Sequence, residues 1–395
     1  MTGNRVRQLK ALLLGLLVFL GLLAIPNFLS AQVPENAPSP RQNLSDQSPN
    51  QKASPVPVDE SPADQSTADE SPADQPPTHD TDPEDDQSVE KKRAEKRKLR
   101  FKKQGGVVYQ TIDGEELKCD IYTPEGEGPF PAILAVHGGA WRQGSKFALI
   151  RHAWKMAQAG YVVVAINYRH APKHRFPAQI HDCKHAIRWM KSRANEMKID
   201  SKHIGAFGYS AGGHLVSLLG TSDADDGLEG EVSPEMEKFE TRIQAVAAGG
   251  APCEFSWIDD DSQVLSYWLG GSPIQKPDAY RTASPTTYVS ADDPAFFLFH
   301  GTADLIVPAS SSLKLHQTLE KTGISTQHYK AEGNGHFSTF SDIGWMEKAI
   351  EFFDDHLKND KEPTSKPPGK PSVENKISPA DKIKNLQQSA LKSQE

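Results

Sequence analysis

Gly208-Tyr209-Ser210-Ala211-Gly212 directly follows the apolar run 204–207, which predicts a buried strand, and leads into an apolar stretch that predicts a helix. A serine flanked in this way is typical of a sharp, strained turn, because only neighbours without side chains let the backbone pass so closely. Such a strand-turn-helix junction exposes the serine hydroxyl at the edge of a sheet. The first turn of the helix also directs backbone N–H groups at negative charge that develops there. We therefore predict that Ser210 is a nucleophile.

Short apolar runs alternate with helical patterns on both sides of this turn. Continuous apolar runs suit strands buried on both faces, and their alternation with helices favours a mostly parallel sheet that is covered on both sides. The predicted class is therefore α/β, with an eight-stranded sheet. The predicted strands are 106–110, 117–122, 132–136, 161–166, 204–207, 245–248, 296–299 and 325–329, and the predicted helices are 178–195, 214–219, 310–321 and 345–356.

Two further residues complete the chemistry that a serine nucleophile needs. A serine hydroxyl is weakly nucleophilic until a base takes its proton, and that base needs a carboxylate to orient it. Asp304 follows the predicted strand 296–299, and His336 lies in a glycine-rich loop after the predicted strand 325–329. Ligands bind beyond the carboxyl ends of the strands in such sheets. We predict that Asp304 is the orienting acid and His336 the general base for Ser210.

A second glycine-containing loop predicts a site for negative charge. The stretch His137-Gly138-Gly139-Ala140-Trp141 follows the predicted strand 132–136 and matches loops that supply N–H groups to a developing oxyanion. The expected donors are the backbone N–H groups of Gly138, Gly139 and Ala211. His137 is expected to brace this loop rather than to transfer protons.

Aromatic residues provide candidate substrate contacts. The stretch 253–288 contains Trp257 and Trp268, and it falls between two predicted strands, where it could cover the site. We assign Trp141, Tyr209, Trp257 and Trp268 as tentative substrate-binding residues. In the alternative interpretation, the aromatic side chains of this stretch form a small core of its own.

No metal site is expected. His181 and His185 stand four residues apart with an acid after the first, but the acid is Asp rather than Glu and the segment is an amphipathic helix. The three cysteines, Cys119, Cys183 and Cys253, allow at most one internal disulfide, and their spacing does not choose the pair.

The N-terminal residues predict export. Residues 1–31 combine a basic start, the apolar run 11–25 and a small residue suited to cleavage at Ala31, which is typical of a signal peptide. Cleavage is expected, and a retained N-terminal anchor is the alternative. In either case the protein is expected outside the cytoplasm, as a secreted or periplasmic protein.

Composition divides the rest of the chain. Residues 32–103 form a spacer, first acidic and then basic, that is too polar to fold. Its basic end, 91–103, is expected to be a solvated helical lead-in, with contact to anionic envelope material as the alternative. Residues 104–358 can bury one core and form the predicted catalytic domain, whereas 359–395 is predicted to be a disordered tail. The net charge of −8 argues against a nucleic-acid partner, although most of it comes from the spacer.

These residues resemble a known group of esterases and lipases, those related to hormone-sensitive lipase, and especially the feruloyl and acetyl-xylan esterase-like proteins. The resemblance covers about 106–357 and includes Asn167-Tyr168-Arg169, Ala171-Pro172, Phe176-Pro177-Ala178-Gln179 and Ser284-Pro285. It implies the α/β-hydrolase fold, and the family's catalytic serine, aspartate and histidine fall on Ser210, Asp304 and His336. One departure is Ala140, which stands where the family's loop has a third glycine. The resemblance therefore leaves the acyl-size preference of this protein open.

The resemblance and the residues together predict a serine ester hydrolase that acts on short-chain or carbohydrate-linked acetyl and feruloyl esters. Its two-step acyl transfer requires no metal or organic cofactor. The first alternative is an amide hydrolase, such as a formamidase or peptidase, which would use the same three residues. The second is a non-catalytic binding protein of the same fold. The natural ester and the oligomeric state stay open, because a fold does not specify them.

Overall fold

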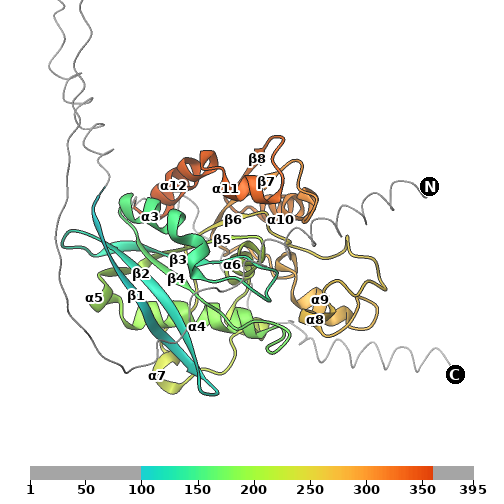
Figure 1. The fold of residues 1–395 in the computed structure, drawn as a ribbon, viewed down its shortest axis with the longest axis horizontal. Coiled ribbons are helices and arrows are strands. Elements are labelled where there is room, and N and C mark those ends of the chain that lie inside the picture. The colour runs from blue at the N-terminus through green and yellow to red at the C-terminus, as the bar shows by residue number, and fades with distance from the viewer. Residues whose placement is uncertain (1–98, 359–395) are drawn as a thin grey trace, which may run out of the picture. The chain divides into compact units, whose positions relative to one another are not determined.

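A single eight-stranded sheet organises the part of the chain that the computed structural model describes, residues 99–358 (Figure 1). The predictions for 1–31, for 32–98 and for 359–395 fall outside these residues. No helix within 99–358 is both long enough and apolar enough to cross a membrane. The strands are β1 (Phe101–Ile112), β2 (Glu115–Pro124), β3 (Phe130–Val136), β4 (Val162–Ile166), β5 (Ile199–Tyr209), β6 (Ala245–Gly249), β7 (Ala295–Gly301) and β8 (Thr326–Ala331).

Helices connect most of these strands. The longer ones are α3 (Ile150–Gln158), α4 (Ala178–Ser192), α6 (Ala211–Thr221), α10 (Ala309–Thr322) and α12 (Gly344–Leu357). The shorter ones are η1 (Lys146–Leu149), α5 (Ala194–Met197), η2 (Ala224–Asp226), α7 (Pro234–Glu237), α8 (Ser266–Leu269), α9 (Pro277–Thr282), η3 (Pro285–Thr287) and α11 (His336–Ser341).

The strand order is β1-β2-β4-β3-β5-β6-β7-β8. The first two pairings, β1 with β2 and β2 with β4, are antiparallel, and all the others are parallel. The carboxyl ends of β3, β5, β6, β7 and β8 therefore share one edge of the sheet. All eight predicted strands are present, and the predicted α/β-hydrolase fold is confirmed.

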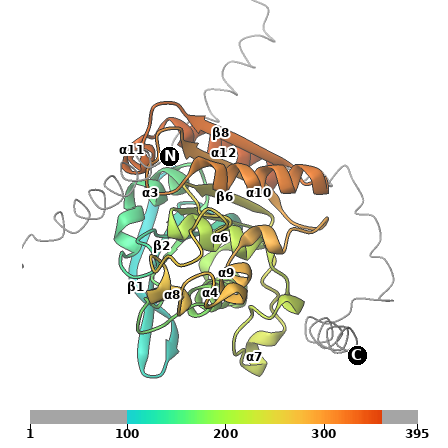
Figure 2. The same ribbon diagram turned by 90° about the vertical axis from the view of Figure 1, so that its right-hand side faces the viewer.

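Two buried apolar layers hold the sheet, one on each face. Alternate residues of β4 belong to different layers: Val162 and Val164 lie in the layer that also holds residues of α4, α6 and α10, whereas Val163 lies in the layer with α3 and α12. Figures 1 and 2 show α3 and α12 on one side of the sheet and α4 on the other. Since both faces are covered, the central strands need the continuous apolar runs seen in the sequence.

The predicted boundary at residue 104 is wrong, because β1 begins at Phe101. The Phe101 ring packs 6.0 Å from that of Tyr122, and the Lys103 ammonium lies 2.9 Å from an Asp120 carboxylate oxygen. Residues 101–103 are therefore a strand of the domain rather than the end of a helical lead-in. Their basic composition suggested a solvated segment, but an edge strand can carry exposed charges beside one anchoring ring.

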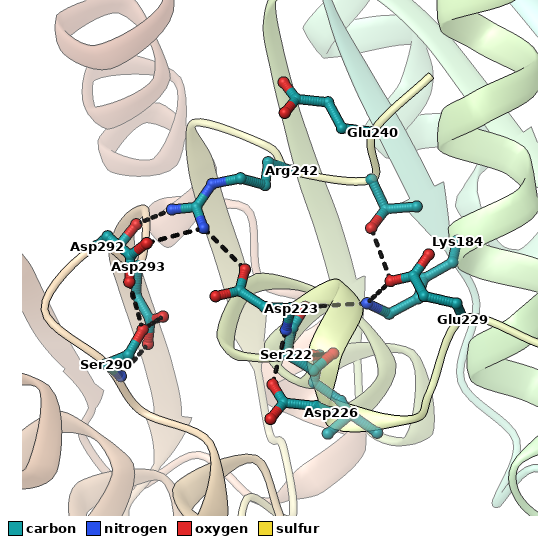
Figure 3. A network of polar contacts seen from close by, with 12 residues as sticks. Lys184, Ser222, Asp223, Asp226, Glu229, Glu240, Arg242, Ser290, Asp292 and Asp293 are labelled. Atoms are coloured by element: carbon teal, nitrogen blue, oxygen red, sulfur yellow. Dashed lines mark hydrogen bonds and ion pairs between the residues drawn. The ribbon is translucent and has the colours of Figure 1, made fainter. Parts of the chain in front are cut away.

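A polar network fastens the connection between α6 and β6 to the rest of the domain (Figure 3). The ammonium of Lys184 on α4 is fully buried and lies 2.9 Å from the Ser222 carbonyl and 2.6 Å from a Glu229 carboxylate oxygen. Further along this connection, the Arg242 guanidinium lies 2.8 Å from Asp223 and 3.1 Å from Asp292. A connection with little regular structure is thus held by charge pairs.

The cysteines form no disulfide in this structure. Cys119, Cys183 and Cys253 are all buried and free. The pairing that their spacing left open is therefore not made.

Candidate active site

Ser210 occupies a strained turn between β5 and α6. Its backbone φ of 56° and ψ of −123° are unfavourable for a residue with a side chain. A Cβ atom on Gly208 would overlap the Gly212 carbonyl, and one on Gly212 would overlap the Val136 carbonyl. The turn is held by the Ser210 N–H, which donates a 2.8 Å hydrogen bond to the carbonyl of Gly249. Both glycines are thus required by close backbone approach, as the sequence pattern predicts.

Asp304 follows β7, and its side chain is fully buried. The N–H groups of Ile306 and Val307 each donate a 2.9 Å hydrogen bond to Oδ1. The other oxygen, Oδ2, lies 2.6 Å from Nδ1 of His336. The backbone therefore fixes one carboxylate oxygen and leaves the other to orient the imidazole.

His336 begins α11, after the loop that follows β8, and it is nearly buried. Because its Nδ1–H donates to a carboxylate, its Nε2 carries the free lone pair that a general base needs. The His336 carbonyl accepts a 2.6 Å hydrogen bond from the Tyr209 hydroxyl. Gly250 lies beside the imidazole, since a Cβ atom on Gly250 would be 3.2 Å from Cε1 of His336. Gly250 also directly follows Gly249, whose carbonyl accepts the N–H of Ser210. The structure thus places the turn that carries Ser210 and the His336–Asp304 pair at the same edge of the sheet.

The carboxyl of Asp304 has a perturbed pKa. Burial raises it, but hydrogen bonds from His300 and His336, with the charge of His336, outweigh burial and hold the pKa well below its usual range. His300 Nε2 lies 3.3 Å from Oδ2 of Asp304, and His300 Nδ1 lies 2.8 Å from the hydroxyl of Ser312. Asp304 therefore stays ionised at neutral pH.

The backbone of the predicted oxyanion loop lies against Ser210. A Cβ atom on Gly138 would be 3.2 Å from Cβ of Ser210 and 2.8 Å from the carbonyl of Tyr209. Gly139 has a φ of 124°, and its carbonyl accepts the N–H of Arg142 at 3.1 Å, which closes a tight turn. The N–H of Ala211 is in the first turn of α6, which has no intrahelical acceptor. Gly138 therefore lies against Ser210 and Ala211 directly follows it, while the oxyanion role of the three N–H groups stays a prediction.

His137 braces the loop, as expected. Its Nδ1–H donates a 2.8 Å hydrogen bond to the carbonyl of Gly138, and its ring stacks 4.3 Å from that of Tyr168. Burial lowers its pKa to about 3, so the ring is neutral at physiological pH.

The tentative substrate contacts divide into three groups. Trp268 is fully buried and Trp141 is 4% exposed, with their rings stacked 3.7 Å apart. Both belong to the core, so their assignment to direct substrate contact needs correction. Tyr209 is also buried, and its hydroxyl is bound to His336. Trp257 is half-buried and donates its indole N–H to the carbonyl of Glu254 at 2.8 Å, and its role stays a prediction.

Two further histidines support the site: sequence reasoning missed the first, and for the second it predicted a packed helix residue without identifying its partners. His300 lies near the end of β7, four residues before Asp304, and this spacing was the available signal. His214, on α6, accepts the indole N–H of Trp141 at 3.2 Å and lies 2.6 Å from the carbonyl of Ala283. Burial lowers the His214 pKa to about 4, and no local pattern identifies its two partners.

The His181–His185 segment is structural. Asp182 is fully buried and paired with Arg169, whose Nη2 lies 2.7 Å from Oδ1. Across residues 99–358, no group of three or more His, Cys, Asp or Glu side chains is placed to hold a metal ion.

The sheet order, the strained serine turn and the polar residues at the carboxyl ends of β5, β7 and β8 define a protein of the α/β-hydrolase fold. Residues 119–319 match the BD-FAE family model, and the chain belongs to this family.

Among curated proteins, the chain is 34% identical over 195 residues to the probable carboxylic ester hydrolase LipM of Mycobacterium tuberculosis, covering 47% of this chain and 44% of LipM. It is 29% identical over 232 residues to esterase LipQ of the same organism, covering 56% and 54%. The chain thus spans about half the length of the curated relatives it matches.

Solved structures are similar over more of their length. A truncated carbohydrate esterase from gut microbiota has a TM-score of 0.57 and 25% identity, covering 67% of this chain and 99% of that protein. Esterase 2 of Thermogutta terrifontis with bound propionate has a TM-score of 0.53 and 26% identity, covering 65% and 92%.

Proposed function

We propose that this protein is a carboxylic ester hydrolase that works by acyl transfer through Ser210, His336 and Asp304. The observation that carries the proposal is a strained serine turn joined, through the Tyr209 hydroxyl, to a histidine whose Nδ1 is bound at 2.6 Å to a buried carboxylate. The names of the similar proteins, which are carboxylic ester hydrolases and esterases, support the reaction class.

The proposed reaction has two halves. Nε2 of His336 takes the hydroxyl proton of Ser210 while Oγ attacks the ester carbonyl, and the resulting oxyanion is bound by the N–H groups of Gly138, Gly139 and Ala211. The protonated His336 then gives its proton to the leaving alcohol, which leaves an acyl-enzyme. A water molecule, deprotonated by His336, attacks this ester, and collapse of the second intermediate releases the acid and restores Ser210. Asp304 stabilises the imidazolium in both halves without itself taking the proton.

The proposed substrates are short-chain or carbohydrate-linked esters. One similar solved structure is described as a carbohydrate esterase and another as a bifunctional GH43-CE protein of Bacteroides eggerthii. The Thermogutta terrifontis esterase binds propionate and butyrate, which are short acyl products. Export, proposed from the sequence of residues 1–31, would place the enzyme where polysaccharide esters are found, and the basic stretch 91–103 could add contact with anionic envelope material.

Hydrolysis assays with the full chain test this function. We expect turnover of p-nitrophenyl acetate and butyrate, less turnover of p-nitrophenyl octanoate, and release of acetate or ferulate from acetylated xylan or methyl ferulate. Ser210→Ala is the control, because it removes the nucleophile and leaves the rest of the site in place. Loss of all turnover in Ser210→Ala would support the mechanism, whereas an inert wild type would refute the esterase proposal.

The same site could hydrolyse amides, so the assay includes an arylformamide and p-nitroacetanilide. Turnover of these amides without turnover of the esters would assign the protein to the amidases. If no substrate is cleaved and Ser210 does not react with a fluorophosphonate, the protein is a binding protein of this fold.

A further inference from the structure

The loop that passes over Ser210 contains a turn in an unfavourable conformation. Ala140 and Trp141 are its two central residues, and their φ values are 51° and 57°. Positive φ at both positions is typical of a type I′ turn, where glycine, asparagine and aspartate are favoured. Neither residue is of these types, so contacts from elsewhere in the fold must hold the turn.

The first of these contacts comes from Tyr267 in α8. Its hydroxyl donates a 2.8 Å hydrogen bond to the carbonyl of Ala140. The guanidinium of Arg142, on the far side of the turn, lies 5.0 Å from the centre of the Tyr267 ring. One side chain thus contacts the turn at its first central residue and again just after its second.

The second contact comes from the next residue, Trp268. Its ring stacks on Trp141 with 3.7 Å between centroids and 3° between planes. Trp268 is itself held by α4 and by the residues just before that helix. Its indole N–H donates to Oε1 of Gln179 on α4 at 3.0 Å, and its carbonyl accepts the N–H of Phe176 at 3.1 Å. A fully buried residue held on both sides is a rigid support for Trp141.

We propose that Tyr267 and Trp268 are positioning residues that hold the loop 137–144 so that the N–H groups of Gly138 and Gly139 face the developing oxyanion. This role rests on the proposed function, because it concerns the oxyanion of acyl transfer. Donors act strongly on a transition state only when they are fixed in advance, and a misplacement of about 1 Å can cost on the order of 100-fold in rate. The aromatic residues of α8 therefore act on the substrate through the loop rather than by touching it.

Tyr267→Phe tests the first contact, because it removes one hydroxyl and keeps the ring. The matched control is Tyr288→Phe, which removes a hydroxyl that donates to the carbonyl of Thr282 at a similar 2.9 Å, away from the loop. With p-nitrophenyl acetate we expect kcat to fall by about 3- to 10-fold in Tyr267→Phe, since one hydrogen bond of the loop is lost. KM should change by less than about twofold, because uniform substrate binding is not affected. The control should keep the wild-type kcat.

A raised KM with an unchanged kcat would overturn the proposal, because it would mean that Tyr267 binds substrate in the ground state. Equal kcat values in the two variants would overturn it as well.

Hydrogen exchange provides a readout that does not depend on activity. The N–H groups of Arg142 and Gln143 both donate to the carbonyl of Gly139 at 3.1 Å and so report on the turn. We expect peptides that cover 137–144 to exchange faster in Tyr267→Phe than in Tyr288→Phe. Unchanged exchange would overturn the positioning role whatever the activity. Faster exchange in a protein whose wild type cleaves no ester would support the hold on the loop and refute the proposed function.

A double variant tests the reason for the contact. Ala140→Gly removes the cost of a positive φ, so the turn should need less support. If Tyr267 acts by holding a strained turn, Tyr267→Phe should lower kcat less in the Ala140→Gly background than in the wild type. Equal reductions in the two backgrounds would mean that the conformation of Ala140 is not what Tyr267 stabilises.

Discussion

The hydroxyl of Tyr209 donates a 2.6 Å hydrogen bond to the backbone carbonyl of His336, so the residue beside the candidate nucleophile also holds the candidate base. The two residues are 127 positions apart in the sequence and lie on different elements, β5 and α11. The turn that presents Ser210 and the loop that presents His336 are therefore joined directly, without help from the candidate catalytic side chains.

Removal of this hydroxyl should affect both stability and catalysis. In Tyr209→Phe we expect a loss of about 1 kcal/mol in the free energy of unfolding, because a buried carbonyl loses its donor. We also expect kcat to fall by up to about 10-fold, since the imidazole is less well placed. Urea unfolding and p-nitrophenyl acetate kinetics measure the two effects. The control is Tyr280→Phe, whose hydroxyl bonds to the Gly271 carbonyl at 3.1 Å; a kcat equally low in the control would contradict the prediction.

Asp304→Asn tests the role of the carboxylate. The amide would keep the shape of the side chain but would no longer favour the His336 tautomer that leaves Nε2 free, so we expect a loss on the order of 10⁴-fold in kcat. KM should change little, because Asp304 is buried behind the imidazole. Steady-state kinetics measure this. A loss smaller than about 10-fold would mean that another group orients His336, and His300→Gln in the same background would then identify it.

Much of the fold and the central residues of the site could be predicted from local patterns. The strands β3, β4, β6 and β7 and the second half of β5 are buried on both faces, so they appear as continuous apolar runs whatever their neighbours are. The nucleophile turn is equally local, because the backbone itself requires glycine at positions 208 and 212. Asp304 and His336 follow once the order of strands is known.

The rest depends on contacts between distant residues. A sequence shows that Trp268 is a large aromatic residue, but its burial is decided by Trp141 and Gln179, which lie on other elements. In the four-residue helix α8, no periodicity distinguishes a buried face from an open one. The start of β1 was missed for a similar reason: Phe101 is a single ring within a basic run, and its packing partner Tyr122 belongs to another strand.

The three thiols should be unreactive in the folded protein. Burial raises the pKa of Cys119 and of Cys253 to about 12, and burial also raises that of Cys183. Treatment of the protein with iodoacetamide at pH 8 should modify none of them, and the same treatment in denaturant should modify all three. Mass spectrometry without reducing agent counts the adducts. A single adduct after unfolding would show that two of the cysteines form a disulfide.

Lys184 should be important for stability because its ammonium is buried against Glu229 (Figure 3). Burial lowers the pKa of Lys184, whereas for Glu229 the pairing with Lys184 and Arg188 outweighs burial and lowers the pKa. Lys184→Met leaves a partly buried carboxylate with one partner fewer, so we expect a loss of about 3 kcal/mol in urea unfolding.

Two variants check that interpretation. Lys184→Met combined with Glu229→Gln and Arg188→Met should recover most of the stability, because all three charges of this cluster are then removed. Lys191→Met, on the same helix, should cost less, because its partner Glu240 is 70% exposed and 3.6 Å away. If the single and triple variants are equally unstable, packing of the lysine stem rather than the charge cluster is responsible.

Asp293 should make stability depend on pH. Burial, together with the nearby Asp223 and Asp292, raises the pKa of its carboxyl to about 7 even though Ser290 donates to it. An unfolded aspartate has a pKa of about 3.9, so between about pH 4 and pH 7 the folded state binds a proton that the unfolded state has released. The free energy of unfolding must therefore fall as the pH rises through this range and then level off.

Asp293→Asn removes this titration, so its stability relative to the wild type should increase from pH 4 to pH 8 by an amount that approaches, at most, about 4 kcal/mol. Urea unfolding at pH 4, 5, 6, 7 and 8 measures the difference. Asp278→Asn is the control, because it removes a carboxylate that is 81% exposed and should show a difference that is nearly constant with pH. Parallel stability curves for the wild type and Asp293→Asn would mean that the carboxyl of Asp293 is already ionised in the folded protein near pH 5, held so by its hydrogen bonds from Ser290 despite its burial.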